Sequence, residues 1–226
     1  MWGTFINVAA VLGGSVVGLL VGKRLPSRVS DAVMPTMGLF TLFLGIKTAF
    51  ETENSMIVLF SLVIGTVIGS LIDIERHLDR LGEFLKRRVG SNGSGDFTQG
   101  FVTACILYCV GPMAIMGAIQ DGLLKDSSIL ITKSVMDGVS SIAYSSSLGV
   151  GVAFSAIPLL IYQGLMSLLA TWVSPLMSAS VIAEMSATGG VLLMAIGLNL
   201  TLKSKIKVGN MLPSLFVAIA IAAFMT

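Results

Sequence analysis

One segment of an otherwise apolar sequence carries a charged pair that could bind an ion. In "ITKSVMDGVSSIAYSSSLG", residues 131–149, Lys133 and Asp137 stand four residues apart, which places them on one face of a helix. An ionisable group at the centre of a membrane helix costs roughly 2.5–3.5 kcal/mol, so such groups seldom occur there without a function. The segment predicts a cation or proton site at Asp137, with Lys133 tuning its charge.

Hydroxyl groups lie on more than one face of the same predicted helix. They belong to Ser134, Ser140, Ser141, Tyr144, Ser145, Ser146 and Ser147. A membrane helix that is polar over much of its circumference needs a water-lined cavity or polar neighbours. We therefore expect a polar pathway along it. The alternative is a self-compensated Lys133–Asp137 pair and serines that only pack against neighbouring helices.

Two other segments supply candidate neighbours for this helix. In "YCVGPMAIMGAIQDG", residues 108–122, Gly111 and Pro112 fall near the middle of an apolar stretch, where proline frees a backbone carbonyl. Gln120 and Asp121 follow them, and Gln163 lies in "FSAIPLLIYQG", residues 154–164. A helix break beside polar side chains is typical of the discontinuous helices that bind ions or substrates in transporters.

Further polar residues lie within or beside apolar segments. Glu184 is about one turn into such a segment, and we expect it to line an outer vestibule together with Asp121. The alternative is a solvated Glu184 at the membrane interface. Asn7 and Asn199 are expected to form hydrogen bonds across helices.

The composition places these residues in a polytopic membrane protein. The 226 residues are 54% hydrophobic and 12% charged, with a mean hydropathy of +0.93, whereas a soluble domain carries about 25% charged residues. Apolar segments near the length of about 20 residues that a spanning helix needs occur at residues 4–22, 33–50, 56–73, 98–120, 128–147, 150–172, 180–201 and 208–225. The expected fold is all-α and integral to the membrane, with about eight transmembrane helices in a single domain over residues 1–226. The lipid bilayer is its expected surroundings.

The basic residues predict how these helices are oriented. Eleven of the fourteen fall in loops on one side: Lys23, Arg24, Arg28, Arg76, Arg80, Lys86, Arg87, Arg88, Lys203, Lys205 and Lys207. Because cytoplasmic loops are enriched in Lys and Arg, this pattern favours eight spans with both termini outside. Seven spans would put the loop "KSKIK" on the opposite side.

Between the third and fourth spans, residues 74–97 are expected to form a cytoplasmic charged segment. Ile74, Leu78, Leu81 and Leu85 make one apolar stripe, which predicts an amphipathic helix at the membrane surface. The following "GSNGSGD" predicts a flexible loop.

Two glycine patterns predict how helices pack. "GLFTLFLGIKTAF" from Gly38 and "GVLLMAIGLNLTL" from Gly190 align without gaps, so that Gly45 matches Gly197. Since the two spans run in opposite directions, we expect an inverted repeat of spans 1–3 and 6–8, an arrangement common in transporters. The alternative is a chance similarity of glycine-rich helices.

In the first span, three glycines recur every four residues: Gly14, Gly18 and Gly22. Such a face lets another helix approach closely. It meets either another span or a second copy of the chain, so a homodimer through this face is one expectation.

Several function classes find no support in the sequence. It contains no H-E-x-x-H, G-x-S-x-G or Walker motif, so we do not expect an enzyme or a cofactor. Cys105 and Cys109 are interpreted as packing residues, not as metal ligands. The basic residues lie at membrane edges without interleaved aromatic residues, which argues against a nucleic-acid partner.

Three strings carry a family resemblance: "CVGPMAIMGAIQDGL", "KSVMDGVSSIAYSSSLGVGVAFSAIPLLIYQG" and "EMSATGGVLLMAIGLNL" with the later "KVGNMLPSL". At these strings the sequence resembles the YqgA/YdfK family of bacterial inner-membrane proteins, a domain of unknown function (554). The resemblance covers nearly the whole chain and implies a location in the bacterial cytoplasmic membrane. It brings no substrate and no functional residues.

The polar segment therefore decides the functional interpretation. We expect a secondary transporter or channel for an ion or small polar solute. The rival is a non-transporting scaffold or partner subunit whose polar residues only hold helices together.

Overall fold

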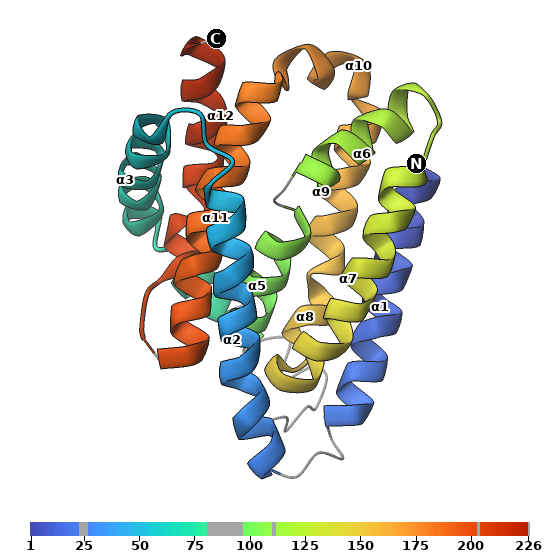
Figure 1. Cartoon of the computed structure of the whole chain (residues 1–226), viewed down its shortest axis with the longest axis vertical. Helices are drawn as coiled ribbons and strands as arrows, with labels where there is room; N and C mark the ends of the chain where they lie inside the picture. The colour runs from blue at the N-terminus through green and yellow to red at the C-terminus, as the bar shows by residue number, and fades with distance from the viewer. Residues whose placement is uncertain (23–26, 81–96, 110–111, 203, 226) are drawn as a thin grey trace. The chain divides into compact units, whose positions relative to one another are not determined.

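The described elements of this chain are helical. The computed structural model describes residues 1–22, 27–80, 97–109, 112–202 and 204–225 (Figure 1). Its α-helices are α1 (Trp2–Gly22), α2 (Ser27–Ala49), α3 (Ser55–Ile72), α5 (Phe97–Cys109), α6 (Pro112–Leu123), α7 (Ser128–Leu148), α8 (Gly151–Phe154), α9 (Ala156–Leu168), α10 (Ala170–Val173), α11 (Ala179–Leu202) and α12 (Pro213–Met225). Two 3₁₀ turns, η1 (Ser174–Leu176) and η2 (Val208–Met211), join them.

Within the described residues, six helical stretches are long and apolar enough to cross a membrane. They are Trp2–Gly22, Ala32–Ala49, Ser55–Ile72, Gly151–Leu168, Ala179–Leu202 and Val208–Met225. Helices α5 and α6, inclined by 57° to each other, make a seventh if they form one broken span. The chain is thus an all-α protein with the helices of a multi-pass membrane protein, and each stretch lies within a few residues of a span expected from the sequence.

Some expectations fall outside the described residues. Gly111, Lys23, Arg24, Lys203 and the stretch 81–96 belong to this group. Residues 74–80 are helical, which agrees with the start of the predicted amphipathic helix. That start is fixed by two bonds: Glu75 Oε2 accepts the Gly209 N–H at 2.6 Å, and Asn210 Oδ1 accepts the Glu75 N–H at 2.8 Å.

The helices group into two compact units that interleave in the sequence. The first unit comprises Met1–Met34 and Gly82–Ser174, and the second comprises Pro35–Leu81 and Pro175–Thr226. The polar segment singled out above lies in the first unit, and Glu184 lies in the second.

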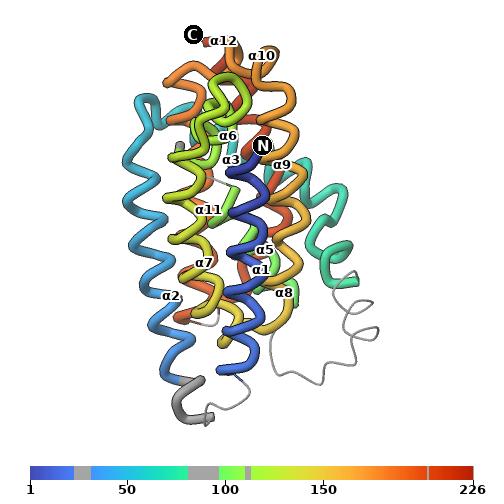
Figure 2. The backbone as a smooth tube through the Cα atoms, turned by 90° about the vertical axis from the view of Figure 1, so that its right-hand side faces the viewer, coloured from blue at the N-terminus to red at the C-terminus, as the bar shows by residue number. Residues whose placement is uncertain are grey.

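Helices α1 and α7 form the most extensive contact of the first unit, side by side in Figures 1 and 2. They run parallel, because Gly3 meets Leu130 and Gly18 meets Ile142. A Cβ atom at Gly14 would stand only 2.3 Å from the carbonyl oxygen of Gly138, so the α1 backbone touches the α7 backbone directly.

The glycine face of α1 meets another helix of the same chain, which is one of the two alternatives expected from the sequence. The face formed by Gly14, Gly18 and Gly22 lies against the carbonyl oxygens of α7 in the same chain.

A helix break lies where the sequence separates the segments 128–147 and 150–172. Helix α7 ends at Leu148, and Gly149 adopts a φ of 84°, which favours glycine and turns the chain into α8 and α9. At the far end of α9, the Ser167 hydroxyl donates to the carbonyl oxygen of Ala118 on α6 at 2.7 Å. These contacts place α9 beside α6 and α1.

In the second unit, α2 and α11 pack antiparallel through glycines. A Cβ atom at Gly197 would lie 2.8 Å from the Gly38 carbonyl oxygen, and one at Gly190 would lie 2.7 Å from that of Gly45. Helices α3 and α12 also pack closely, with Gly65 against Ser214.

Candidate functional site

Helix α7 turns its polar side chains inward and its apolar side chains outward. Val135, Met136 and Val139 are 65%, 60% and 64% exposed, whereas Lys133 and Asp137 are 6% and 5% exposed. A helix in water shows the opposite arrangement, because water solvates the polar face. This pattern fits a helix whose outer face meets lipid and whose inner face meets polar neighbours.

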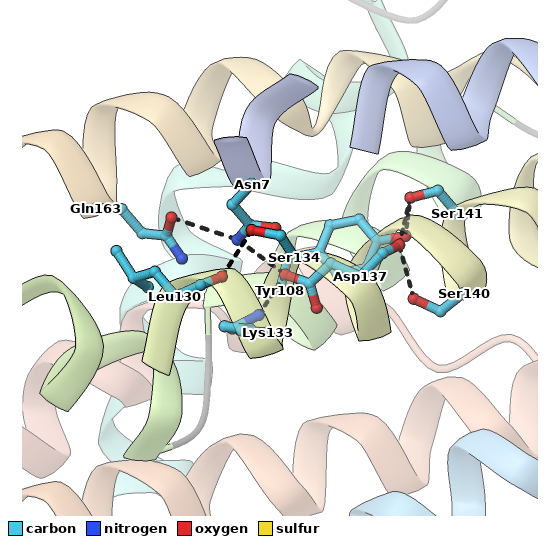
Figure 3. Close-up of polar contacts among 9 residues, drawn as sticks. All are labelled: Asn7, Tyr108, Leu130, Lys133, Ser134, Asp137, Ser140, Ser141 and Gln163. Carbon is cyan, nitrogen blue, oxygen red and sulfur yellow. Dashed lines mark hydrogen bonds and ion pairs between the residues drawn. The ribbon is translucent and has the colours of Figure 1, made fainter. Parts of the chain in front are cut away.

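Four helices of the first unit bring their polar side chains to one cluster (Figure 3). It consists of Asn7 from α1, Tyr108 from α5, Lys133, Asp137 and Ser141 from α7, and Gln163 from α9. We call these six residues the polar cluster.

The centre of the polar cluster is the ion pair predicted from the i, i+4 spacing, which is confirmed. The Lys133 ammonium contacts Asp137 Oδ2, and both side chains are less than a tenth exposed. Lys133 Nζ also lies 5.9 Å from the centroid of the Tyr108 ring, which favours the cation. In a low-dielectric interior the ammonium and the carboxylate stabilise each other, because burying either charge without its partner costs a large free energy.

Asn7 connects the ion pair to a third helix, as expected for a polar residue of the first span. Its Nδ2 donates to Asp137 Oδ2 at 3.0 Å and to Gln163 Oε1 at 3.3 Å. Asn7 and Gln163 are both fully buried. The carboxylate of Asp137 is therefore held by donors from α7 and α1 together.

Several buried polar atoms on the helices that form the polar cluster have no hydrogen-bond partner within the described protein. They are Asn7 Oδ1, Gln163 Nε2, Thr4 Oγ1, Thr103 Oγ1, Ser145 Oγ and the Tyr162 hydroxyl. A buried polar group left unpaired costs about 1–3 kcal/mol, so a polar solute that reached it would be bound favourably. Groups from four helices thus offer both acceptors and donors.

The serines of α7 bond chiefly to their own helix. Ser140 and Ser141 donate to the carbonyl oxygen of Asp137 at 3.0 and 2.6 Å, and Ser134 donates to that of Leu130 at 2.6 Å. The Ser141 hydroxyl also lies 3.1 Å from the Tyr108 hydroxyl. Ser141 therefore belongs to the polar cluster, whereas the half-buried Ser140 lies beside it.

Gln120 and Asp121 lie at the α6–α7 loop and contact none of the polar cluster through the bonds described. Gln120 Nε2 donates to Asp126 Oδ2 at 2.6 Å, and the Ser127 N-terminal to α7 donates from its hydroxyl to Asp121 Oδ1 at 2.7 Å. The Met1 amine lies 2.7 Å from Asp121 Oδ2. Hydrogen bonds to the Asp126 carboxylate, from the Ser128 N–H first and then from the Ser128 hydroxyl and Gln120, hold the pKa of Asp126 below its ordinary value.

Glu184 serves a loop of the second unit. Its side chain is fully buried, and it accepts hydrogen bonds from the Thr52 hydroxyl at 2.7 Å and from the N–H groups of Glu53 and Asn54, both at 2.8 Å. The alternative of a solvated Glu184 is therefore wrong. With three donors on its carboxylate, Glu184 holds this loop and does not line an open vestibule.

Asn199 also serves a loop. It exchanges hydrogen bonds with Ile206 and accepts one from Ser204, so it organises its own connection instead of bonding across helices.

Two members of the polar cluster did not stand out as site residues in the sequence. Asn7 was notable only as a polar residue in an apolar segment, and nothing in the sequence pairs it with Asp137, 130 positions later. Tyr108 is an isolated tyrosine near the α5–α6 break. Among the remaining candidates, Tyr144 is fully buried on α7, and Pro112 begins α6.

Comparisons with known proteins agree on one family. A family model described as a protein of unknown function (DUF554) matches residues 2–223. The uncharacterized protein YqgA of Escherichia coli (strain K12) is 33% identical over 228 residues, which cover 99% of this chain and 97% of that protein. The uncharacterized membrane protein YdfK of Bacillus subtilis (strain 168) is 29% identical over 221 residues, with 96% and 93% covered. No solved structure matches the chain.

These matches extend over nearly the full length of the sequence and include the segments that form the polar cluster. They confirm the resemblance found in the sequence, and the apolar helices agree with the relative named as a membrane protein. This chain belongs to the DUF554 family of proteins of unknown function.

Proposed function

We propose that this protein is a secondary transporter or channel that passes an ion or small polar solute across the bacterial inner membrane. The observation that carries the proposal is the polar cluster itself. A charged pair and two amides lie buried among four helices whose outer faces are apolar. Polar and ionisable groups at such positions mark substrate and ion pathways in membrane proteins.

The proposal counts α7 as an eighth span. It has 21 residues, enough to cross a bilayer, and its polar residues lower its mean hydropathy while its outward face stays apolar. Its parallel contact with α1 requires both helices to cross in the same direction, as first and fifth spans do. Both termini then lie outside, and the loops rich in Lys and Arg face the cytoplasm.

The glycine contacts of the second unit support the inverted repeat. The repeat aligns Gly38 with Gly190 and Gly45 with Gly197, whereas the contacts join Gly38 to Gly197 and Gly45 to Gly190. A two-fold rotation that exchanges the aligned positions converts one contact into the other. Such pseudo-symmetry is the arrangement from which many transporters build alternating access.

A specific observation favours the rival function, a membrane scaffold or partner subunit. Lys133 neutralises Asp137 within one helix, and the α1–α7 backbones touch without intervening side chains. A polar cluster that only holds helices together would remain closed to water in every state of the protein.

Cysteine accessibility distinguishes the two functions. Ser134, Asp137, Ser141 and Ser145 would each be replaced by Cys in a variant lacking Cys105 and Cys109, then treated with membrane-impermeant thiol reagents from either side. The matched control is Val139→Cys, on the outward face of the same helix at a similar depth. Membrane-impermeant thiol reagents react with the ionised thiolate, which forms only where water reaches the cysteine. A cysteine that faces lipid therefore stays unlabelled.

Transport predicts labelling at Ser141→Cys and none at Val139→Cys. Absence of labelling at all four inward positions from both sides would support the scaffold. Equal labelling of the inward and outward positions would contradict a membrane-spanning α7.

A further inference from the structure

The charges of the polar cluster limit what it can bind. Its only formal charges are the Lys133 ammonium and the Asp137 carboxylate, which together are neutral. A second cation added to this pair would leave an uncompensated positive charge among fully buried groups, which is strongly disfavoured. A cation therefore binds at Asp137 only if Lys133 gives up its proton.

We propose that Lys133 is a tethered competitor, so that the polar cluster exchanges one proton for one alkali-metal cation. The inference rests on the proposed transport function and names its substrate class and its coupling ion. In one state, protonated Lys133 occupies the carboxylate of Asp137. In the other, neutral Lys133 has withdrawn and the cation takes its place.

The exchange conserves charge and atoms. The Lys133 ammonium releases its proton to water on the side to which the cluster is open, and the cation from that side binds the freed carboxylate. On the other side a proton returns to Lys133, and the new ammonium displaces the cation. The cluster is neutral before and after each step.

The groups around Asp137 suit a hard cation because they present oxygen atoms. Asn7 already donates to Asp137 through Nδ2, and its unpartnered Oδ1 is an acceptor on the same side chain. Rotation of that amide would bring a second oxygen toward the carboxylate. Carboxylate and carbonyl oxygens suit hard cations, whereas softer metal ions bind sulfur or imidazole ligands.

The other titratable groups on the described helices packed around the polar cluster do not supply a competing charge. Tyr108 and Cys109 face it from α5, Tyr144 lies on α7 itself, and Tyr162 lies on α9. All four are neutral when protonated. Asn7 from α1 and Gln163 from α9 carry no ionisable group, so Lys133 is the base whose protonation decides access to Asp137.

The test measures uptake of radioactive Na⁺ into liposomes that contain the full chain, with a pH-sensitive dye inside. Wherever Lys133 is protonated in the Na⁺-free protein, protons and Na⁺ compete one for one. The apparent KM for Na⁺ should fall about tenfold for each unit rise in pH, because cation binding releases a proton. Each Na⁺ that enters should expel one proton from the liposome.

Two variants of Lys133 act in opposite directions. Lys133→Met removes the tethered competitor, so the KM for Na⁺ should depend on pH less steeply than in the wild type, because only protonation of Asp137 itself then competes with Na⁺. Lys133→Arg keeps the ion pair but has a guanidinium that does not deprotonate, so Na⁺ uptake should be lost while the protein still folds. Lys47→Met, in the second unit, is the control and should behave as the wild type.

Each outcome of these experiments tests either the proton–cation exchange or the transport function on which it rests. A wild-type KM that does not change with pH, or Na⁺ uptake by Lys133→Arg, overturns the exchange. If Lys133→Met does not fold, the arginine variant and proton counterflow still decide it. If Na⁺ does not enter while Ser141→Cys is labelled, the exchange is wrong and another solute is transported. If neither occurs, both proposals are wrong.

Discussion

Asp137 obtains its two observed donors from different elements, and they do not contribute in the same way. Lys133, one turn earlier on α7, balances its charge, whereas Asn7 on α1 adds a neutral hydrogen bond. Removing one member of a buried ion pair strands the other charge, while removing both strands none. The stability of the pair is therefore strongly non-additive.

A double-mutant cycle tests this at Lys133 and Asp137. Lys133→Met and Asp137→Asn should each lower the free energy of unfolding by about 3–5 kcal/mol, because each leaves an unpaired charge. The double variant should lose less than either single variant. The measurement is reversible unfolding in detergent in the absence of Na⁺, and losses that simply add would contradict a buried pair.

Glu184 illustrates a buried carboxylate with a structural role. Glu184→Leu leaves two N–H groups and the Thr52 hydroxyl without their acceptor, at about 1–3 kcal/mol for each buried group. Glu184→Gln keeps one acceptor oxygen and should lose less. Limited proteolysis at residues 51–54 measures the effect, and equal cleavage of the two variants would argue against this role.

Helices α1 and α7 are positioned by the absence of side chains. Gly14→Ala would place a methyl group 2.3 Å from the Gly138 carbonyl oxygen, so the two backbones must separate. Gly13→Ala is the matched control, because a Cβ atom there meets nothing within 4 Å. Gly14→Ala should lower the unfolding temperature, and Gly13→Ala should leave it unchanged or raise it, since alanine is favoured over glycine in a helix by about 1 kcal/mol.

Local patterns in the sequence are sufficient to predict where the helices lie. They are insufficient to predict which helices contact one another. Hydropathy located the helices within a few residues, and the four-residue spacing predicted the Lys133–Asp137 pair. The glycine face of α1 predicted close packing without identifying α7 as the neighbour. Contacts such as Asn7 to Gln163 join residues 156 positions apart, and they depend on the assembled helices, which no local pattern encodes.

The number of spans is a property of the whole molecule, and it depends on whether α7 crosses the membrane. With α7 as a span, residues 53 and 125 lie outside, while residues 76 and 205 lie in the cytoplasm. Single cysteines at these four positions, labelled in intact cells with an impermeant reagent, should react only at 53 and 125. Reaction at 125 and 205 together would contradict eight spans.

The parallel contact of α1 and α7 also has a consequence for biosynthesis. Residues 23–127 separate the two helices, so at about 5–20 residues per second α1 leaves the ribosome on the order of ten seconds before α7. Helix α1 is long and apolar enough to cross a membrane, whereas α7 is not among the helices that qualify by hydropathy. If α7 spans the bilayer as proposed, its polar face needs the hydrogen bond from Asn7, so α7 can be inserted stably only after α1 is already in place.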